Sequence, residues 1–166
     1  MKSLNQYIKE KLIINKDYHD NMIVVNSFDE LRKILVYRYD KLGAGTKDNP
    51  IDFNDIDVSN LDSFSNYKGK GIFEETQFKY IDISDWDVSN VTDMSYMFFA
   101  CEELKSVGDI SSWDVSKVES MISMFSHCKT LTSVGDLSNW DVSNVKYMSY
   151  MFNDCPIKEE YKPKFK

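Results

Sequence analysis

The chain has 166 residues, of which 42 % are hydrophobic, 14 % aromatic and 28 % charged, a composition that supports one folded core and excludes a wholly disordered chain. Its net charge of -7 disfavours nucleic acid and anionic lipid as partners, and no apolar run approaches the length of a membrane span or a signal-peptide core. Three Cys, an odd number, argue against a disulfide scaffold and indicate a reducing compartment.

Residues 1–50 are expected to form a helical front part. The first segment predicts a short amphipathic helix, because its apolar residues recur at helical spacing: Leu4, Tyr7, Ile8 and Leu12. Residues 22–25 predict a strand. Ser27, with Glu30 three residues later, predicts the start of a second helix that ends at Gly43 and has the apolar stripe Leu31, Ile34, Leu35 and Tyr39. We expect this second helix to cap the part of the chain that follows.

Residues 51–155 consist of a repeat with a period of 27 residues, which is seen in the spacing of Trp86, Trp113 and Trp140. Three copies are regular, and a degenerate copy precedes them, in which Ile56 stands in place of Trp. One copy of this length cannot cover its own apolar face, so we expect neighbouring copies to share one core.

Within a regular copy, the apolar residues fall at i, i+3, i+7 and i+10 and predict one helix that begins after Ser89: Val91, Met94, Phe98 and Cys101. Residues 104–108 predict a short strand that ends at a glycine turn. The predicted fold class is therefore α/β, a short right-handed leucine-rich-repeat-like solenoid of 27-residue coils, each with one strand and one helix. Residues 156–166 predict a C-terminal tail that closes the last coil.

The consensus of the copies, DISxWDVSxVxxMxxMFxxCxxLxSVG, resembles the leucine-rich-repeat-like domain of unknown function found in mycoplasma lipoproteins and Bacteroidales surface proteins. The resemblance covers about residues 27–155 and implies a protein-interaction scaffold without catalytic residues. Surface members of that group are expected to carry an export signal, which residues 1–10 do not show. Those ten residues instead resemble, more loosely, targeting sequences of internal head proteins of large tailed phages. A phage-encoded protein in a bacterial host cell, free in the cytoplasm or part of the virion, is therefore a hypothesis.

The positions that vary between copies predict the binding face. On a helical wheel they lie opposite the apolar stripe and form the columns Thr92/Glu119/Lys146, Tyr96/Ser123/Tyr150 and Phe99/Ser126/Asn153. Exposed aromatic residues are favoured at interface centres. The candidate partner-binding residues are therefore Tyr96, Phe99, Glu119, Lys146 and Tyr150. Isolated exposed aromatics also occur on surfaces without a partner, so that alternative stays open.

Other chemistry is disfavoured by the residues present. The column Cys101, Cys128 and Cys155, with His127 next to it, could suggest a metal site, but the thiols share the apolar stripe and lack chelate spacing. Paired aspartates such as Asp82 and Asp87 could suggest calcium, yet such side chains more often bond backbone amides at a turn. We expect no metal, no cofactor and no catalytic residue.

Two functions remain, and an enzyme is the third choice. The first is a non-catalytic scaffold that binds a protein or glycoprotein through the outer face of the repeat. The alternative is a virion-associated protein that docks through its N-terminal helix. A homo-oligomer is also possible, because an uncovered strand edge could pair with a copy of itself.

Overall fold

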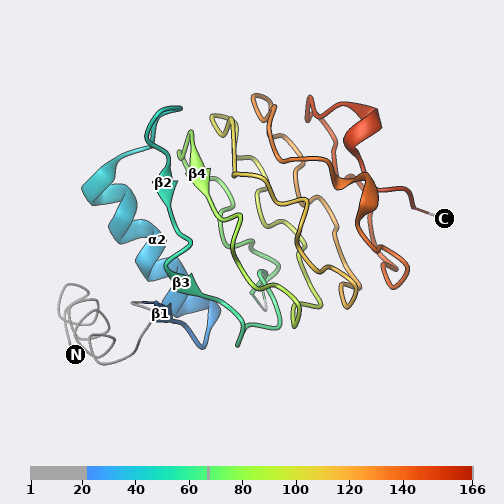
Figure 1. Cartoon of the computed structure of the whole chain (residues 1–166), viewed down its shortest axis with the longest axis horizontal. Coiled ribbons are helices and arrows are strands. Elements are labelled where there is room, and N and C mark those ends of the chain that lie inside the picture. The colour runs from blue at the N-terminus through green and yellow to red at the C-terminus, as the bar shows by residue number, and fades with distance from the viewer. Residues whose placement is uncertain (1–21, 67, 166) are drawn as a thin grey trace.

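The computed structural model describes residues 22–66 and 68–165, and little of this part of the chain lies in helices or strands. It contains the strands β1 (Ile23–Val24), β2 (Ile51–Asp52), β3 (Ile56–Asp57) and β4 (Ile81–Asp82), the helix α2 (Phe28–Leu42), and the 3-10 helices η2 (Leu137–Asn139) and η3 (Glu159–Tyr161). Helix α2 lies at one end of the molecule and the C-terminus at the other, and the repeat lies between them (Figure 1). The predicted first helix and the phage-type leader fall in residues 1–21, outside the described residues.

Helix α2 begins and ends where the sequence predicts. The Ser27 Oγ accepts the Glu30 amide at 3.2 Å, and the Glu30 carboxylate accepts the Asn26 amide at 2.9 Å, which is the reciprocal arrangement of a capping box. At the other end the Gly43 amide bonds the Tyr39 carbonyl, with Gly43 at a φ of 77°. Of the four predicted stripe residues, Leu31, Ile34 and Leu35 are buried. The fourth, Tyr39, is partly buried and packs against the core. The structure therefore has a helix at the residues where the sequence predicts the second one.

The strands pair in parallel and only briefly. β1 pairs with β3, and β2 pairs with β4, each over two residues. Further along the chain, equivalent residues of successive copies form isolated parallel bridges, such as Asp93 with Ser120 and Ser120 with Tyr147. Because bridged residues lie 27 positions apart, neighbouring copies lie side by side in register (Figure 1).

The predicted fold class is wrong. In the part of the chain that the structure describes there are two two-stranded parallel sheets and one α-helix, not a multi-coil leucine-rich-repeat solenoid with a strand and a helix in every coil. The segments predicted as helices after Ser89, Ser116 and Ser143 are runs of turns, and the predicted strands at 104–108 and 131–135 are reduced to single bridges.

The reason lies in the backbone of each copy. Tyr96 and Ala100 have φ of 59° and 55°, and the equivalent residues of the other copies are also positive: Ser123, His127, Tyr150 and Asp154. A right-handed helix needs negative φ throughout, so two such residues per copy end any helical run. Alternate amides instead reach the next copy, as in the bonds from Tyr96 to the Ile122 carbonyl at 2.8 Å and from Phe98 to the Met124 carbonyl at 2.9 Å.

The core runs through the copies as columns of like residues. Phe98, Phe125 and Phe152 stack with centroid distances of 5.3 and 5.5 Å, and Trp113 stacks on Trp140 at 6.4 Å. Each Trp Nε1 donates to a carbonyl of the preceding copy: Phe53, Ile83 and Ile110. The predicted Trp, Met, Phe and Cys interior is confirmed in the first two regular copies. In the third copy it is incomplete, because Met148 is 39 % exposed and Phe152 and Cys155 are only partly buried.

Candidate partner-binding face

The paired aspartates of each copy hold its turns. The Asp82 carboxylate accepts both the amide and the hydroxyl of Ser84, at 3.0 and 2.7 Å, and Asp87 accepts the Ser89 amide at 3.0 Å. The same bond recurs at four further aspartates: Asp109, Asp114, Asp136 and Asp141. Hydrogen bonds from the side chain and the backbone of Ser89 hold the pKa of Asp87 below its ordinary value. The prediction that these carboxylates bond backbone amides is confirmed.

The thiols of the Cys column point into the core. Cys101 Sγ donates to the Phe73 carbonyl at 2.9 Å, and Cys128 Sγ donates to the Phe98 carbonyl at 3.0 Å. Burial raises the pKa of Cys101 to about 11 and also raises the pKa of Cys128. A buried thiol with a raised pKa is a poor nucleophile, because the thiolate is the reactive form. Within residues 22–66 and 68–165, no group of three or more His, Cys, Asp and Glu side chains is arranged to hold a metal ion.

Two of the five candidate residues form the centre of an aromatic cluster. Tyr96 and Phe99 meet edge to face with their centroids 5.8 Å apart, and Phe99 meets the ring of His127 at 5.7 Å. The His127 Nδ1 lies 3.0 Å from an Asp154 carboxylate oxygen, which fixes the orientation of the imidazole. The three rings are half-buried, so each offers one edge to solvent and is held by its neighbours.

The other three candidates are more exposed. Glu119 and Lys146 form an ion pair at 2.9 Å, and the Lys146 amide also bonds the Glu119 carbonyl. Tyr150 is 73 % exposed and makes no ring contact with any described residue. The structure thus joins Tyr96 to Phe99 and Glu119 to Lys146, whereas Tyr150 stands two copies away from Tyr96.

The predicted outer face is partly wrong. Ser123 and Ser126, which were expected to face outward, are 7 % and 2 % exposed. Tyr96 and Phe99, expected as exposed rings, are half-buried. The helical wheel assigned these positions, and it fails because the segment is a run of turns whose alternate residues lie against the neighbouring copy.

His127 was missed as a member of the face. The sequence prompted attention to it only as a neighbour of Cys128, but the left-handed backbone at His127, with a φ of 60°, turns its ring outward while the Cys128 thiol turns inward. The signal that could have found it is the spacing to Asp154, since residues 27 apart in this repeat occupy equivalent positions in adjacent copies.

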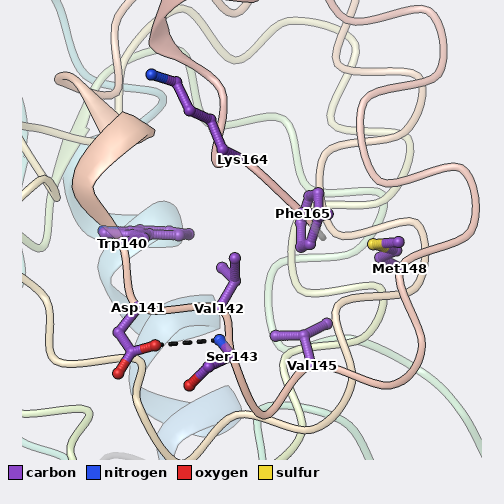
Figure 2. Close-up of a pocket in the computed structure, with 8 residues that line it drawn as sticks. All are labelled: Trp140, Asp141, Val142, Ser143, Val145, Met148, Lys164 and Phe165. Atoms are coloured by element: carbon purple, nitrogen blue, oxygen red, sulfur yellow. Dashed lines mark hydrogen bonds between the residues drawn. The ribbon is translucent and has the colours of Figure 1, made fainter.

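A separate hollow lies at the C-terminal end of the molecule, where the third copy meets the tail. Figure 2 shows Trp140 at the left, Lys164 above, Phe165 and Met148 at the right, and Asp141, Val142, Ser143 and Val145 in the lower part of the view. Its volume is about 280 Å³. Its lining therefore combines apolar side chains with one ammonium group, that of Lys164, and one carboxylate, that of Asp141.

The comparisons with known proteins give one positive result. Neither the curated proteins nor the solved structures contain a match to this chain. Among the described residues, no helix is both long and apolar enough to span a bilayer. The family model described as DUF285, Mycoplasma protein of unknown function, matches residues 48–161, which include all the regular copies and the aromatic cluster. The chain therefore belongs to the DUF285 family.

Proposed function

We propose that this protein is a non-catalytic module that binds another protein through the aromatic cluster Tyr96, Phe99 and His127 together with its charged flank, Glu119 and Lys146. The single observation that carries this proposal is the contrast between the two sides of each copy. The inner Met, Phe and Cys columns are constant, whereas the outer columns change from copy to copy and place Phe99 in contact with both Tyr96 and His127. Constant packing with a variable surface suits recognition.

The geometry of the cluster supports binding in two ways. Half-buried rings have little side-chain freedom left to lose, so ordering them in a complex costs little conformational entropy. Aromatic residues also contribute large contact areas and are enriched among the residues that dominate interface energies. Tyr96 and Phe99 therefore are the expected centre of the interface, and the Glu119–Lys146 pair is expected at its polar rim.

The proposal assigns no catalytic role to the buried thiols or to His127. The thiols of Cys101 and Cys128 are buried, and His127 is held by Asp154 on the outer surface, away from both of them. A nucleophile and its base must be within hydrogen-bond reach of each other. These groups do not meet that requirement.

The test is affinity capture from host lysate with three forms of the chain. The wild type is compared with the double variant Tyr96→Ala/Phe99→Ala and with the control variant Asp85→Ala, which alters an exposed side chain at a turn outside the cluster. We expect one protein to be retained by the wild type and the control and lost by the double variant, with all three melting at similar temperatures. Equal capture by all three would refute the proposed face.

The alternative of a virion-associated protein rests on residues 1–10 and stays a prediction. It is distinguished by deleting residues 1–14. Under the proposal made here the shortened chain keeps its partner, whereas a packaged protein would be lost from particles.

A further inference from the structure

The peptide groups of the turn segments point in one direction. In the second regular copy, the Ser120, Ile122, Met124 and Ser126 carbonyls accept from the preceding copy, and the amides that follow them donate to the next copy. These next-copy acceptors are the carbonyls of Tyr147, Ser149, Met151 and Asn153. Every second peptide group therefore carries its C=O toward α2 and its N–H toward the C-terminal end.

One continuous hydrogen-bond chain shows the consequence. The Phe73 amide bonds the Met97 carbonyl, the Phe98 amide bonds the Met124 carbonyl, and the Phe125 amide bonds the Met151 carbonyl, each at 2.9 Å. The peptide dipoles in this row add head to tail, as they do along an α-helix. The row has a negative carbonyl end and a positive amide end, and linked hydrogen bonds of this kind strengthen one another.

The carbonyl end of the row is capped by a cation. The first carbonyl, that of Ile72, accepts a hydrogen bond from the Arg32 guanidinium of helix α2. A positive group at the negative end of aligned peptide dipoles is the favourable pairing. The fold thus provides one charged cap, and provides it at the end where a cation is needed.

The amide end is open. The N–H groups of Met148, Tyr150, Phe152 and Asp154 continue the rows, and none of them has an acceptor among the residues that the structure describes. Tyr150 and Met148 are exposed, and both belong to the last copy at the C-terminal end of the molecule (Figure 1). These four N–H groups occupy the positions equivalent to Met121, Ser123, Phe125 and His127, whose amides donate toward the C-terminal end, so we infer that they form the positive end of the aligned dipoles and are available to acceptors.

The chemistry of this open amide edge selects its partner. It differs from an ordinary strand edge, which offers donors and acceptors alternately, because only donors point outward along these four residues. The same edge of a second copy would therefore bring N–H groups against N–H groups, and self-pairing is disfavoured. The carboxylate side chains of an acidic segment, by contrast, only accept hydrogen bonds and carry the charge that the dipoles favour.

The local charge does not oppose that choice. Although the chain has a net charge of -7, residues 141–165 contain four Lys against two Asp and two Glu, so this end is neutral and the net negative charge lies elsewhere in the chain. The hollow beside the edge is lined by the Lys164 ammonium group, the Asp141 carboxylate and the apolar side chains of Val145, Met148 and Phe165 (Figure 2).

We propose that the open amide edge of the third copy, formed by the backbone N–H groups of Met148, Tyr150, Phe152 and Asp154, binds an acidic peptide segment of a partner protein. This surface is distinct from the aromatic cluster, since it uses backbone donors at the end of the repeat. It adds a second contact surface and specifies that the segment bound there is acidic.

The test is a backbone amide NMR titration of the full chain with an octaglutamate peptide at low salt, with octalysine as the matched control probe. We expect octaglutamate to shift the four named amides and slow their hydrogen exchange, and the effect to weaken as salt is raised. The variant Met148→Pro removes one donor and should lower the affinity roughly tenfold relative to Met148→Ala, which loses the same side chain but keeps the donor.

Three results would overturn the proposal. The four amides could remain unshifted by octaglutamate, octalysine could shift them equally, or they could be protected in the free protein in a concentration-dependent manner that indicates self-association. The double variant Tyr96→Ala/Phe99→Ala should leave the octaglutamate titration unchanged, so failure of this inference is separable from failure of the proposed function.

Discussion

Replacement of Trp113 by Ala tests whether the copies share one interior. Trp113 is 5 % exposed, stacks on Trp140 with centroids 6.4 Å apart, and donates from Nε1 to the Ile83 carbonyl at 3.3 Å. Burial of about 200 Å² at about 25 cal/mol per Å² corresponds to about 5 kcal/mol, an upper bound because unfolded chains already bury some surface. We expect Trp113→Ala to lower the free energy of unfolding by about 3–5 kcal/mol.

The measurement is urea unfolding followed by far-ultraviolet circular dichroism, with Trp113→Phe as the matched control. The Phe variant keeps a buried ring and loses the Nε1 hydrogen bond, while the Ile83 carbonyl still accepts the Trp86 amide. Its expected loss is about 1–2 kcal/mol. A loss below about 1 kcal/mol for Trp113→Ala would show that this column does not hold adjacent copies together.

Three further substitutions or conditions give clear expectations. Gly108→Ala should lower the melting temperature more than Gly69→Ala, because both glycines have positive φ but only at Gly108 would a Cβ lie 2.4 Å from the Asp82 carboxylate; equal losses would contradict this. At pH 8 a disulfide reagent should modify the half-buried Cys155 before the two fully buried thiols, Cys101 and Cys128, because burial raises the pKa of all three thiols but leaves only Cys155 partly accessible; equal native rates would contradict this. The pKa of Asp87 is depressed by its bonds with Ser89, so its contribution is present above the unfolded value of about 3.9 and is lost as the pH falls through the folded pKa. Urea midpoints at pH 5.5 and pH 3 should therefore differ less in Asp87→Asn than in the wild type, and an unchanged difference would remove Asp87 from the explanation.

Local signals predicted the parts of the fold that local interactions decide. Ser27, Glu30 and Gly43 marked the ends of helix α2, because a capping residue bonds amides only a few positions away. The Asp–Ser turns were foreseen for the same reason, since Asp87 bonds the amide of Ser89. The 27-residue period also indicated which side chains are buried, since the same residue types recur in every copy.

The helices were mispredicted because the turns that form in their place are held by hydrogen bonds between residues far apart in the sequence. A spacing of i, i+3 and i+7 fits a helix, but it also fits successive tight turns whose third and fourth residues return to the same side. Hydrogen bonds such as that from the Met94 amide to the Ser120 carbonyl, 26 residues away, stabilise the turns over the helix. Left-handed backbone at Tyr96, a residue with no particular preference for it, gives no warning in the sequence.

The candidate face was predictable only in part for the same reason. Variation between copies identified Tyr96 and Phe99, which the structure brings into contact. The helical wheel then placed Ser126 on the surface although it is buried, and it gave no reason to include His127. Knowledge of which residues repeat is available from the sequence, whereas knowledge of where each points requires the backbone.

Each copy donates its amides to the next copy, whereas the equivalent amides of the third copy have no acceptor in the part of the chain that the structure describes. Amide hydrogen exchange, followed residue by residue by NMR, tests it at equivalent positions of two copies. We expect slow exchange at Met121, Ser123, Phe125 and His127, whose amides bond the third copy, and fast exchange at Met148, Tyr150, Phe152 and Asp154. Similar protection of both sets in dilute, partner-free protein would contradict it.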